Sequence, residues 1–358
     1  MTEDPPGLRM AALRDWLESH DVPVHGAISA TLLAGGRSNI SYRVTDEAAG
    51  AWVVRRPPLG HVMPSAHDMR REYRGLAGLN RVAFPAPAAI ASCEDETVIG
   101  APFMVMAFVP GDVIDSAEEA ARLAPQERGT VSASLVHALA ALHSVDVQQA
   151  GLESLGRPAG YLTRQVDRWG RQWQLSKTRD LATIDELQAR LAALVGAAEF
   201  GSTTASIVHG DYRVDNVIIG PDDHEVRAVL DWEMATLGDP VADLAVTLVY
   251  WNDQDDSRRL RVPVSEHITV QEGFWSRAEL IDAYARLTGN ALDHLDFCTA
   301  LACFKLAVIM ESIRFRAMSG DQLGTAATDV EGMGQATEAL SELGLEVLAR
   351  GTIEGLSH

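Results

Sequence analysis

Two short stretches decide the fold of this chain, VHGDYRVDN at residues 208–216 and LDWE at residues 230–233. The apolar residues before His209 are typical of a short buried strand, so we expect Asp211 to emerge at its end and to project into a cleft. Turn residues at 220–223 favour a hairpin that returns the chain from Asn216 to Asp231. One carboxylate that orients a hydroxyl, with an amide and a second carboxylate that hold magnesium, is what phosphoryl transfer from a nucleotide requires. The two stretches therefore predict a phosphotransferase active site.

Composition agrees with such an enzyme and excludes other classes. The chain has 358 residues, of which 47% are hydrophobic, and this length suggests about two domains or lobes. Its formal charge of -20, from 50 acidic and 30 basic residues, argues against a nucleic-acid partner. Lysine occurs only as Lys177 and Lys305, so arginine carries almost all the positive charge. This favours forked contacts to phosphate or carboxylate.

Cysteine usage and hydropathy bear on location. The three cysteines, an odd number, lie far from any metal-ligand spacing and argue against a disulfide framework. The first residues are acidic and proline-bearing, unlike a signal peptide. The longest apolar stretch, near residues 301–310, is interrupted by Lys305 and is too short to span a bilayer. We expect a cytoplasmic monomer or homodimer with no membrane role.

The order of the patterns predicts an α+β protein. An amphipathic helix over residues 8–17 comes first, and a strand-rich segment follows it. A breaker at residues 110–112 then separates an N-lobe, residues 1–109, from a larger and mostly helical C-lobe, residues 110–358. The expected strands are 40–44, 51–54 and 102–109, and the expected helices are 65–79, 117–143, 277–287, 295–318 and 337–350.

The motif set resembles the aminoglycoside phosphotransferase and choline kinase family, whose fold is the bilobal fold of protein kinases. His209, Gly210, Asp211 and Asn216 match the family's catalytic loop, and Asp231 matches its magnesium-binding aspartate. Its later Gly-Asp and second aspartate are matched by Gly238, Asp239 and Asp243. The resemblance implies that the Asp243 carboxylate holds the backbone amides of the catalytic loop.

The amino-terminal features of that family also fall in order. The stretch GGRSN at 35–39 resembles its phosphate-covering loop, and Arg55 stands where protein kinases carry their phosphate-binding lysine. Glu72 would be the ion-pair partner of Arg55, although a pairing of Arg56 with Glu72 stays open. Residues 106–109 resemble the hinge that meets adenine. The nucleotide-binding residues so predicted are Gly35, Gly36, Ser38, Asn39, Arg55, Glu72, Met106, Ala107, Phe108 and Val109.

The implied reaction is ATP-dependent phosphorylation of a hydroxyl. Magnesium would be held by Asn216 and Asp231, while Asp211 aligns the acceptor and Arg213 offsets charge on the transferring group. Glu233 either touches the metal or caps a turn. The sequence does not choose between ATP and GTP.

Some residues also have a simpler interpretation than a direct part in the reaction. His209 is expected to support the loop by hydrogen bonding, and His137 with His143 to be a packed or capping pair. Trp169 and Trp173 are expected in the core or a cleft wall, or in an acceptor pocket. Arginines 70, 71 and 74 are typical of a solvated helix face, although with residues 64–67 they could reach an anionic group of a substrate.

The acceptor is not fixed by the fold, since the family serves aminoglycosides, choline, sugars and homoserine. A closer resemblance is to the branch fused to acyl-CoA dehydrogenases, which shares residues 64–67, 71–74, 209–213 and 230–233. That branch implies phosphorylation of a hydroxyacyl-CoA. The alternatives are an aminoglycoside, amino-alcohol or sugar kinase, a catalytically silent nucleotide-binding regulator, and a metal-dependent phosphatase.

Overall fold

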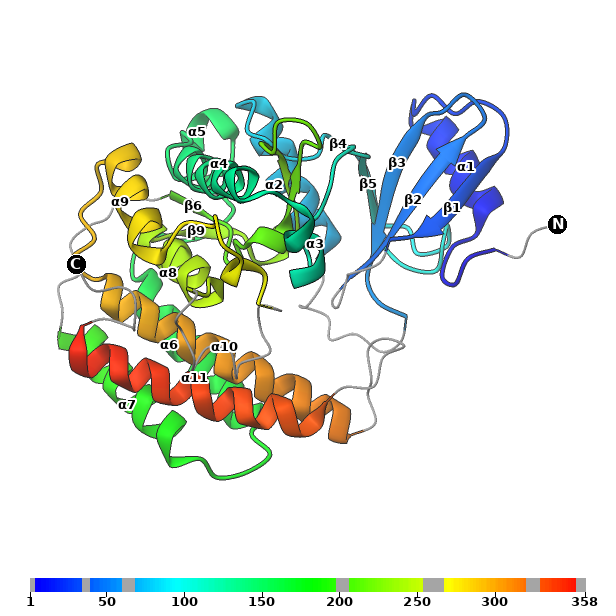
Figure 1. The fold of residues 1–358 in the computed structure, drawn as a ribbon. Coiled ribbons are helices and arrows are strands. Elements are labelled where there is room, and N and C mark those ends of the chain that lie inside the picture. The colour runs from blue at the N-terminus through cyan, green and yellow to red at the C-terminus, as the bar shows by residue number, and fades with distance from the viewer. Residues whose placement is uncertain are drawn as a thin grey trace. The chain divides into compact units, whose positions relative to one another are not determined.

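The structure is a computed structural model that describes residues 4–33, 39–59, 68–197, 206–253, 267–319 and 329–351 (Figure 1). The chain divides into two compact units. Unit 1 comprises Met1–Pro110, Gln148–Leu152 and Arg227–Glu233, and unit 2 comprises Gly111–Val147, Glu153–Val226 and Met234–His358.

Unit 1 is built on a five-stranded antiparallel sheet with the order β1-β2-β3-β5-β4. Alternate residues of its strands, such as Tyr42 and Val54, pack with Leu13 and Leu17 of helix α1 in one apolar core. Because successive strand residues point to opposite faces, Arg55 faces away from this core. The elements are α1 (Met10–Ser19), β1 (Ile28–Leu32), β2 (Ile40–Asp46), β3 (Ala51–Arg56), β4 (Ala89–Cys93) and β5 (Phe103–Ala107).

Helix α2 (Met69–Arg81) carries Glu72 in its first turn. It begins where Asp68 caps it, because the Asp68 side chain accepts a hydrogen bond from Arg71 N at 3.0 Å. The predicted helix began at residue 65, and residues 65–67 lie outside the described part of the chain.

A late segment of the chain completes unit 1. Strand β8 (Val226–Val229) leads into the short 3₁₀ helix η2 (Trp232–Met234). Val229 N donates to Pro85 O at 2.9 Å, and the Trp232 ring stands edge-on to Phe84. These contacts fix the residues on either side of Asp231.

Unit 2 is mostly helical, and helix α10 is buried along most of its length between α6, α7, α8 and α11. Figure 1 shows α10 lying alongside α11. A short sheet of β6 (Ser206–Val208) and β9 (Thr236–Gly238) pairs Ile207 with Leu237. The larger helices are α4 (Pro125–His143), α6 (Tyr161–Ser176), α7 (Ala182–Ala197), α8 (Pro240–Tyr250), α9 (Arg277–Thr288), α10 (Leu295–Met318) and α11 (Val330–Arg350).

The strand-rich sheet and the helical remainder confirm the α+β class, although several boundaries differ from the prediction. The helix predicted over 117–143 is two helices, α3 (Ala117–Arg122) and α4, because Leu123 is extended and Pro125 opens α4. Helix α11 begins seven residues before its predicted start at 337, since Asp329 caps it by accepting from Gly332 N at 2.9 Å. The strand predicted over 102–109 ends at Ala107.

Candidate active site

The catalytic loop leaves strand β6 at His209 and turns sharply at Gly210. Gly210 has a φ of +86°, a region that glycine adopts without strain. A Cβ added there would lie 3.0 Å from the Met234 Cβ and 3.1 Å from the Met234 carbonyl oxygen. The turn that presents Asp211 therefore requires glycine on both conformational and steric grounds.

Asp243, on helix α8, anchors this loop from below. Its carboxylate is fully buried and accepts hydrogen bonds from His209 N at 2.6 Å and Gly210 N at 2.7 Å. The His143 ring lies 3.3 Å from the same carboxylate and 2.6 Å from the Tyr284 hydroxyl. Burial alone would raise the pKa of Asp243, but the hydrogen bond and charge of His143, with those of the loop, hold it below its ordinary value. The carboxylate thus holds the loop amides, as the resemblance implied.

The Asp211 carboxylate is held by neighbours within unit 2. Asn216 Nδ2 donates to Asp211 Oδ2 at 3.1 Å and to the Asp211 carbonyl at 2.8 Å. Arg213 Nε lies 3.5 Å from Asp211 Oδ2, and the buried Tyr250 hydroxyl also hydrogen-bonds to this carboxylate. The structure therefore brings together Asp211, Arg213 and Asn216, three of the residues predicted for the site.

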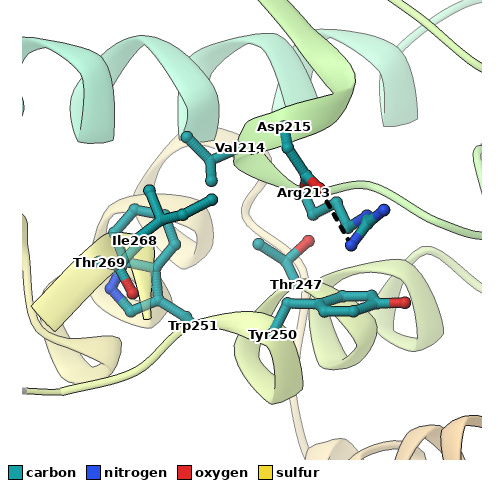
Figure 2. Close-up of a pocket in the computed structure, with 8 residues that line it drawn as sticks. All are labelled: Arg213, Val214, Asp215, Thr247, Tyr250, Trp251, Ile268 and Thr269. Carbon is teal, nitrogen blue, oxygen red and sulfur yellow. Dashed lines mark ion pairs between the residues drawn. The ribbon is translucent and has the colours of Figure 1, made fainter. Parts of the chain in front are cut away.

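Arg213 connects this carboxylate to a small pocket (Figure 2). Its Nη1 lies 3.1 Å from Asp215 Oδ2, and its guanidinium lies 4.7 Å from the centre of the Tyr250 ring. The pocket is lined by Arg213, Val214, Asp215, Thr247, Tyr250, Trp251, Ile268 and Thr269. Arg213 and Asp215 give this small pocket a charged side, and the rest of its lining is largely apolar.

In unit 1 the structure decides between the two arginines of β3. Arg55 Nε lies 3.1 Å from Glu72 Oε1, and Arg55 Nη2 lies 2.6 Å from Asp231 Oδ1. Arg56, on the other face of the strand, donates instead to the carbonyls of Pro57, Gly7 and Ile99. Because successive residues of β3 point to opposite faces, Arg55 is the ion-pair partner of Glu72, and the alternative pairing of Arg56 with Glu72 is wrong.

The Arg55 cluster holds more negative charge than positive. Burial alone would lower the pKa of Arg55, but Glu72, Asp231 and Glu233 raise it well above its ordinary value. Burial, reinforced by Asp231 and Glu233 and opposed by Arg55, raises the pKa of Glu72 to about 7. One guanidinium therefore faces three carboxylates in a site where Glu72 is almost fully buried.

Asp231 and Glu233 follow strand β8 in an unusual backbone conformation. Asp231 has a φ of +61°, which is uncommon for a residue with a side chain. Glu233 Oε2 accepts a hydrogen bond from Asn39 Nδ2 at 3.0 Å, and Asn39 is almost fully buried. Asn39 is therefore positioned next to the carboxylates, whereas Gly35, Gly36 and Ser38 of the predicted phosphate loop lie outside the described residues.

The donor chemistry suits a magnesium ion. The Asn216 amide nitrogen donates to Asp211, so its oxygen is the atom suited to bind a cation. Among the described residues, Arg55 contacts Asp231 through Oδ1 and leaves Oδ2 for a cation. Hard oxygen ligands of this kind, completed by phosphate and water, are those that Mg²⁺ prefers. Within the described residues, no group of three or more His, Cys, Asp or Glu side chains could hold a metal ion. Asn216 belongs to unit 2 and Asp231 to unit 1, so their sharing of one ion stays a prediction.

The predicted hinge, residues 106–109, lies at the end of β5. Ala107 N donates to Ala88 O at 2.8 Å, and Phe108 N donates to Ala51 O at 3.4 Å. The Arg43 guanidinium lies 4.2 Å from the centre of the Phe108 ring. Two amides of this segment are thus already bonded within unit 1, and contact of the hinge with adenine stays a prediction.

Three residues at the catalytic loop were missed from the sequence as parts of the site. They are His143, which supports Asp243, Tyr250, which contacts Asp211, and Lys305, which donates to the Gly210 carbonyl. His143 and Lys305 lie about a hundred residues from their partners, and no local motif marks them. The prediction of a packed His137 and His143 pair missed this role, because only tertiary structure brings His143 to Asp243.

A helical unit whose buried aspartate holds a His-Gly-Asp loop, and a strand-rich unit with an Arg-Glu pair, define a phosphotransferase of the kinase-like class. The family model described as the phosphotransferase enzyme family matches residues 29–295. The chain belongs to this family. It is therefore a phosphotransferase that acts on hydroxyl groups of small molecules.

Relatives and solved structures agree with this assignment. A structure from Ralstonia eutropha JMP134, described as a candidate aminoglycoside phosphotransferase, is 30% identical with a TM-score of 0.77, covering 96% of this chain and 98% of that one. A complex of aminoglycoside phosphotransferase APH(4)-Ia with AMP-PNP and hygromycin B has a TM-score of 0.61 at 14% identity, covering 95% and 99%, and shows the fold alone. These likenesses confirm the protein kinase-like fold.

The curated relatives are longer proteins. Acyl-CoA dehydrogenase family member 11 of Gallus gallus is 32% identical over 346 residues, which cover 93% of this chain and 42% of that protein. The chain thus spans less than half the length of this relative. Among the described residues, no helix combines the length and apolarity that crossing a membrane requires.

Proposed function

We propose that the chain transfers the terminal phosphate of ATP to the hydroxyl of a small-molecule acceptor, with Asp211 orienting that hydroxyl. The observation that carries the proposal is the catalytic loop, in which Asn216 and Tyr250 hold the Asp211 carboxylate while Asp243 fixes the backbone before it. A carboxylate held in this way can align an attacking oxygen and accept its proton. Arg213 lies beside it and can offset negative charge on the group in transfer.

The nucleotide would be bound mainly by residues of unit 1. Arg55, held by Glu72, is the cation for the phosphates, and residues 35–39 would cover them. Asn216 and Asp231 would hold Mg²⁺, which neutralises phosphate charge when bound. The solved complex of APH(4)-Ia with AMP-PNP supports a nucleotide co-substrate for this fold.

For the acceptor we propose a hydroxyacyl-CoA. The relatives named as acyl-CoA dehydrogenase family members support an acyl thioester. The charge on helix α6 supports an anionic acceptor. In and just before this helix, four arginines are exposed, with Asp167 the acid among them, in a chain of net charge -20. They are Arg157, Arg164, Arg168 and Arg171.

These arginines distinguish two acceptor classes. Arg164, Arg168 and Arg171 are spaced to share one helix face, and the charge of Arg168 acts on Lys305, which donates to the catalytic loop. Guanidinium groups suit the phosphates of a CoA carrier, whereas a polycationic aminoglycoside would meet like charge there.

The test is mass spectrometry of a 4-hydroxyacyl-CoA incubated with the protein and magnesium ATP, beside a parallel reaction with kanamycin. We expect a phosphorylated thioester and no phosphorylated kanamycin. Asp211→Ala should lower turnover by roughly two to four powers of ten while nucleotide affinity stays within a few-fold. Asp222→Ala, in the exposed turn after β7 (Val217–Ile219), is the matched control and should behave as the unsubstituted protein.

The possible results separate the reaction from the acceptor. An unchanged thioester alongside another acceptor that is phosphorylated would remove the acyl-CoA proposal and keep the kinase. Equal loss of turnover and nucleotide binding in Asp211→Ala would contradict the role of Asp211. Binding of ATP without turnover of any acceptor would instead support the nucleotide-binding regulator.

A further inference from the structure

Lys305 is a buried lysine that the proposed reaction does not use. It lies in the middle of α10 between the fully buried Phe304 and Leu306, and it is itself only 7% exposed. Within the described residues its ammonium makes one hydrogen bond, to the Gly210 carbonyl, and it lies 5.8 Å from the centre of the Trp169 ring. No ion pair to a described carboxylate accompanies it. A buried ammonium loses its hydration, and no described carboxylate contacts the Lys305 ammonium to compensate for that loss. We therefore expect Lys305 to have a role beyond packing.

The contact falls on the residue directly before Asp211. Gly210 N donates to Asp243 Oδ1 at 2.7 Å, and the Gly210 carbonyl accepts from Lys305. The Asp243 carboxylate therefore holds the amide of Gly210, and the Lys305 ammonium holds its carbonyl. Gly210 has no side chain to pack, so these two contacts are its polar attachments to helices α8 and α10.

The charges around Lys305 are consistent with this contact. Burial lowers the pKa of Lys305, Asp211 and Asp243 oppose that effect, and Arg168 and Arg213 add to it. The positive group therefore lies within electrostatic reach of both carboxylates that matter to the loop. Hydrogen bonds in which the donor is charged are stronger than neutral ones.

We propose that Lys305 is a positioning residue for phosphoryl transfer, which holds the Gly210 carbonyl so that the Asp211 carboxylate keeps its orientation toward the acceptor hydroxyl. The proposal rests on the proposed function of Asp211. Lys305 itself touches no reacting atom. Its loss therefore acts on the alignment of Asp211, which appears in kcat, and leaves the binding of nucleotide and acceptor largely unchanged.

A role in stability alone predicts something different. Lys305→Met leaves the Gly210 carbonyl without its charged donor, which is expected to lower the free energy of unfolding. With a role in stability alone, the folded fraction of Lys305→Met would keep the kcat and both KM values of the unsubstituted protein. The two explanations differ in kcat and not only in stability.

The experiment compares Lys305→Met, Lys305→Arg and Lys177→Met in the full chain. Lys177 is the other lysine of the sequence and directly follows α6. Its Nζ lies 3.4 Å from Asp180 Oδ1. Steady-state kinetics are measured with magnesium ATP and the 4-hydroxyacyl-CoA, and release of inorganic phosphate to water is measured in parallel. Unfolding in urea and hydrogen exchange of residues 206–213 are recorded for each variant.

We expect Lys305→Met to lower kcat by about 100-fold with both KM values within about threefold, because a small misplacement of a reacting group has an effect of this size. Hydrogen exchange of residues 206–213 should be faster in that variant only. Lys305→Arg, which keeps a cation and its donors, should recover part of kcat, and Lys177→Met should change nothing.

Three results would overturn the proposal. They are a kcat for Lys305→Met within about threefold of the unsubstituted protein, a rise in KM at constant kcat, and loss of folding together with activity in both Lys305 variants. Absence of ATP turnover in the unsubstituted protein would instead count against the proposed function, so the two failures are distinguishable.

Discussion

The two units arrange their buried charges in opposite ways. In unit 1 one arginine, Arg55, faces the carboxylates of Glu72, Asp231 and Glu233. In unit 2 one carboxylate, Asp243, is surrounded by N–H groups of His209, Gly210 and the His143 ring. The first cluster keeps excess negative charge, and the second satisfies its carboxylate. The difference shows in the pKa values, since that of Glu72 is raised and that of Asp243 is lowered.

This difference indicates different tasks. A carboxylate that is satisfied by fixed donors holds a loop in place and has no need of a further partner. Under the proposed function, the excess carboxylates of the Arg55 cluster would contact added positive charge, such as a metal ion that arrives with a nucleotide. The contrast leads to three predictions, in order of decreasing effect.

Asp243→Ala should have the largest effect. It leaves two loop amides and the His143 ring without their acceptor, which we expect to cost about 3–5 kcal/mol of unfolding free energy and most of the activity. Urea unfolding and phosphoryl transfer are the measurements. Asp282→Ala, an exposed acid on α9, is the control and should stay within about 0.5 kcal/mol. A similar small change in Asp243→Ala would mean that the loop is held by other contacts.

Arg55→Met should lower the free energy of unfolding less than Asp243→Ala does. The pKa of Glu72 is already raised to about 7, so Glu72 can take up a proton when its partner is removed, and the expected loss is about 1–3 kcal/mol. Nucleotide affinity, measured by calorimetry, should fall about tenfold or more, since a charged donor to phosphate is lost. Arg56→Met on the same strand is the matched variant and should bind nucleotide normally. Equal affinity losses in the two variants would argue against a specific role for Arg55.

The smallest effect concerns His294 and Asp239, which lies at the start of α8. His294 Nε2 lies 2.8 Å from Asp239 Oδ2, and this hydrogen bond raises the pKa of His294 above its ordinary value. A raised histidine pKa contributes stability that is fully present below the ordinary value and is lost as pH rises through the raised one. His294→Asn should therefore lose up to about 1 kcal/mol below about pH 6, and progressively less above about pH 7.

Unfolding free energies between about pH 5.5 and about pH 9 test this dependence, with His137→Asn as the exposed control. A difference between the unsubstituted protein and His294→Asn that stays constant with pH would show that the contact does not depend on the charge of His294.

Sequence alone predicted the parts of the site that follow one another along the chain. Asp211, Arg213 and Asn216 lie within six residues, and their contacts follow from one loop and one 3₁₀ turn, η1 (Val214–Asn216). The pairing of Arg55 with Glu72 was also predicted, but the choice over Arg56 depends on which face of β3 meets α2. Strand register settles that choice, and composition does not.

The parts that sequence could not predict depend on tertiary packing. His143 and Lys305 occur in helices whose apolar residues dominate the pattern, so each was assigned to packing or passed over. The division of the helix predicted over 117–143 was missed although Pro125 marks it, because the helical composition continues on both sides. The roles assigned to the phosphate loop, the hinge and the metal ligands stay predictions.

The Arg55 cluster also has a consequence for the order in which the protein can fold during synthesis. Its contact with Asp231 joins residues 176 positions apart, and the segment that supplies Asp231 emerges from the ribosome after more than a hundred residues of unit 2. The contacts of unit 1 therefore cannot all form at the stage of synthesis when only residues 1–110 exist. Translation must pass Glu233 before Arg55 meets all of its carboxylates, and a fragment that ends at residue 110 is expected to contain the sheet without a finished charge cluster.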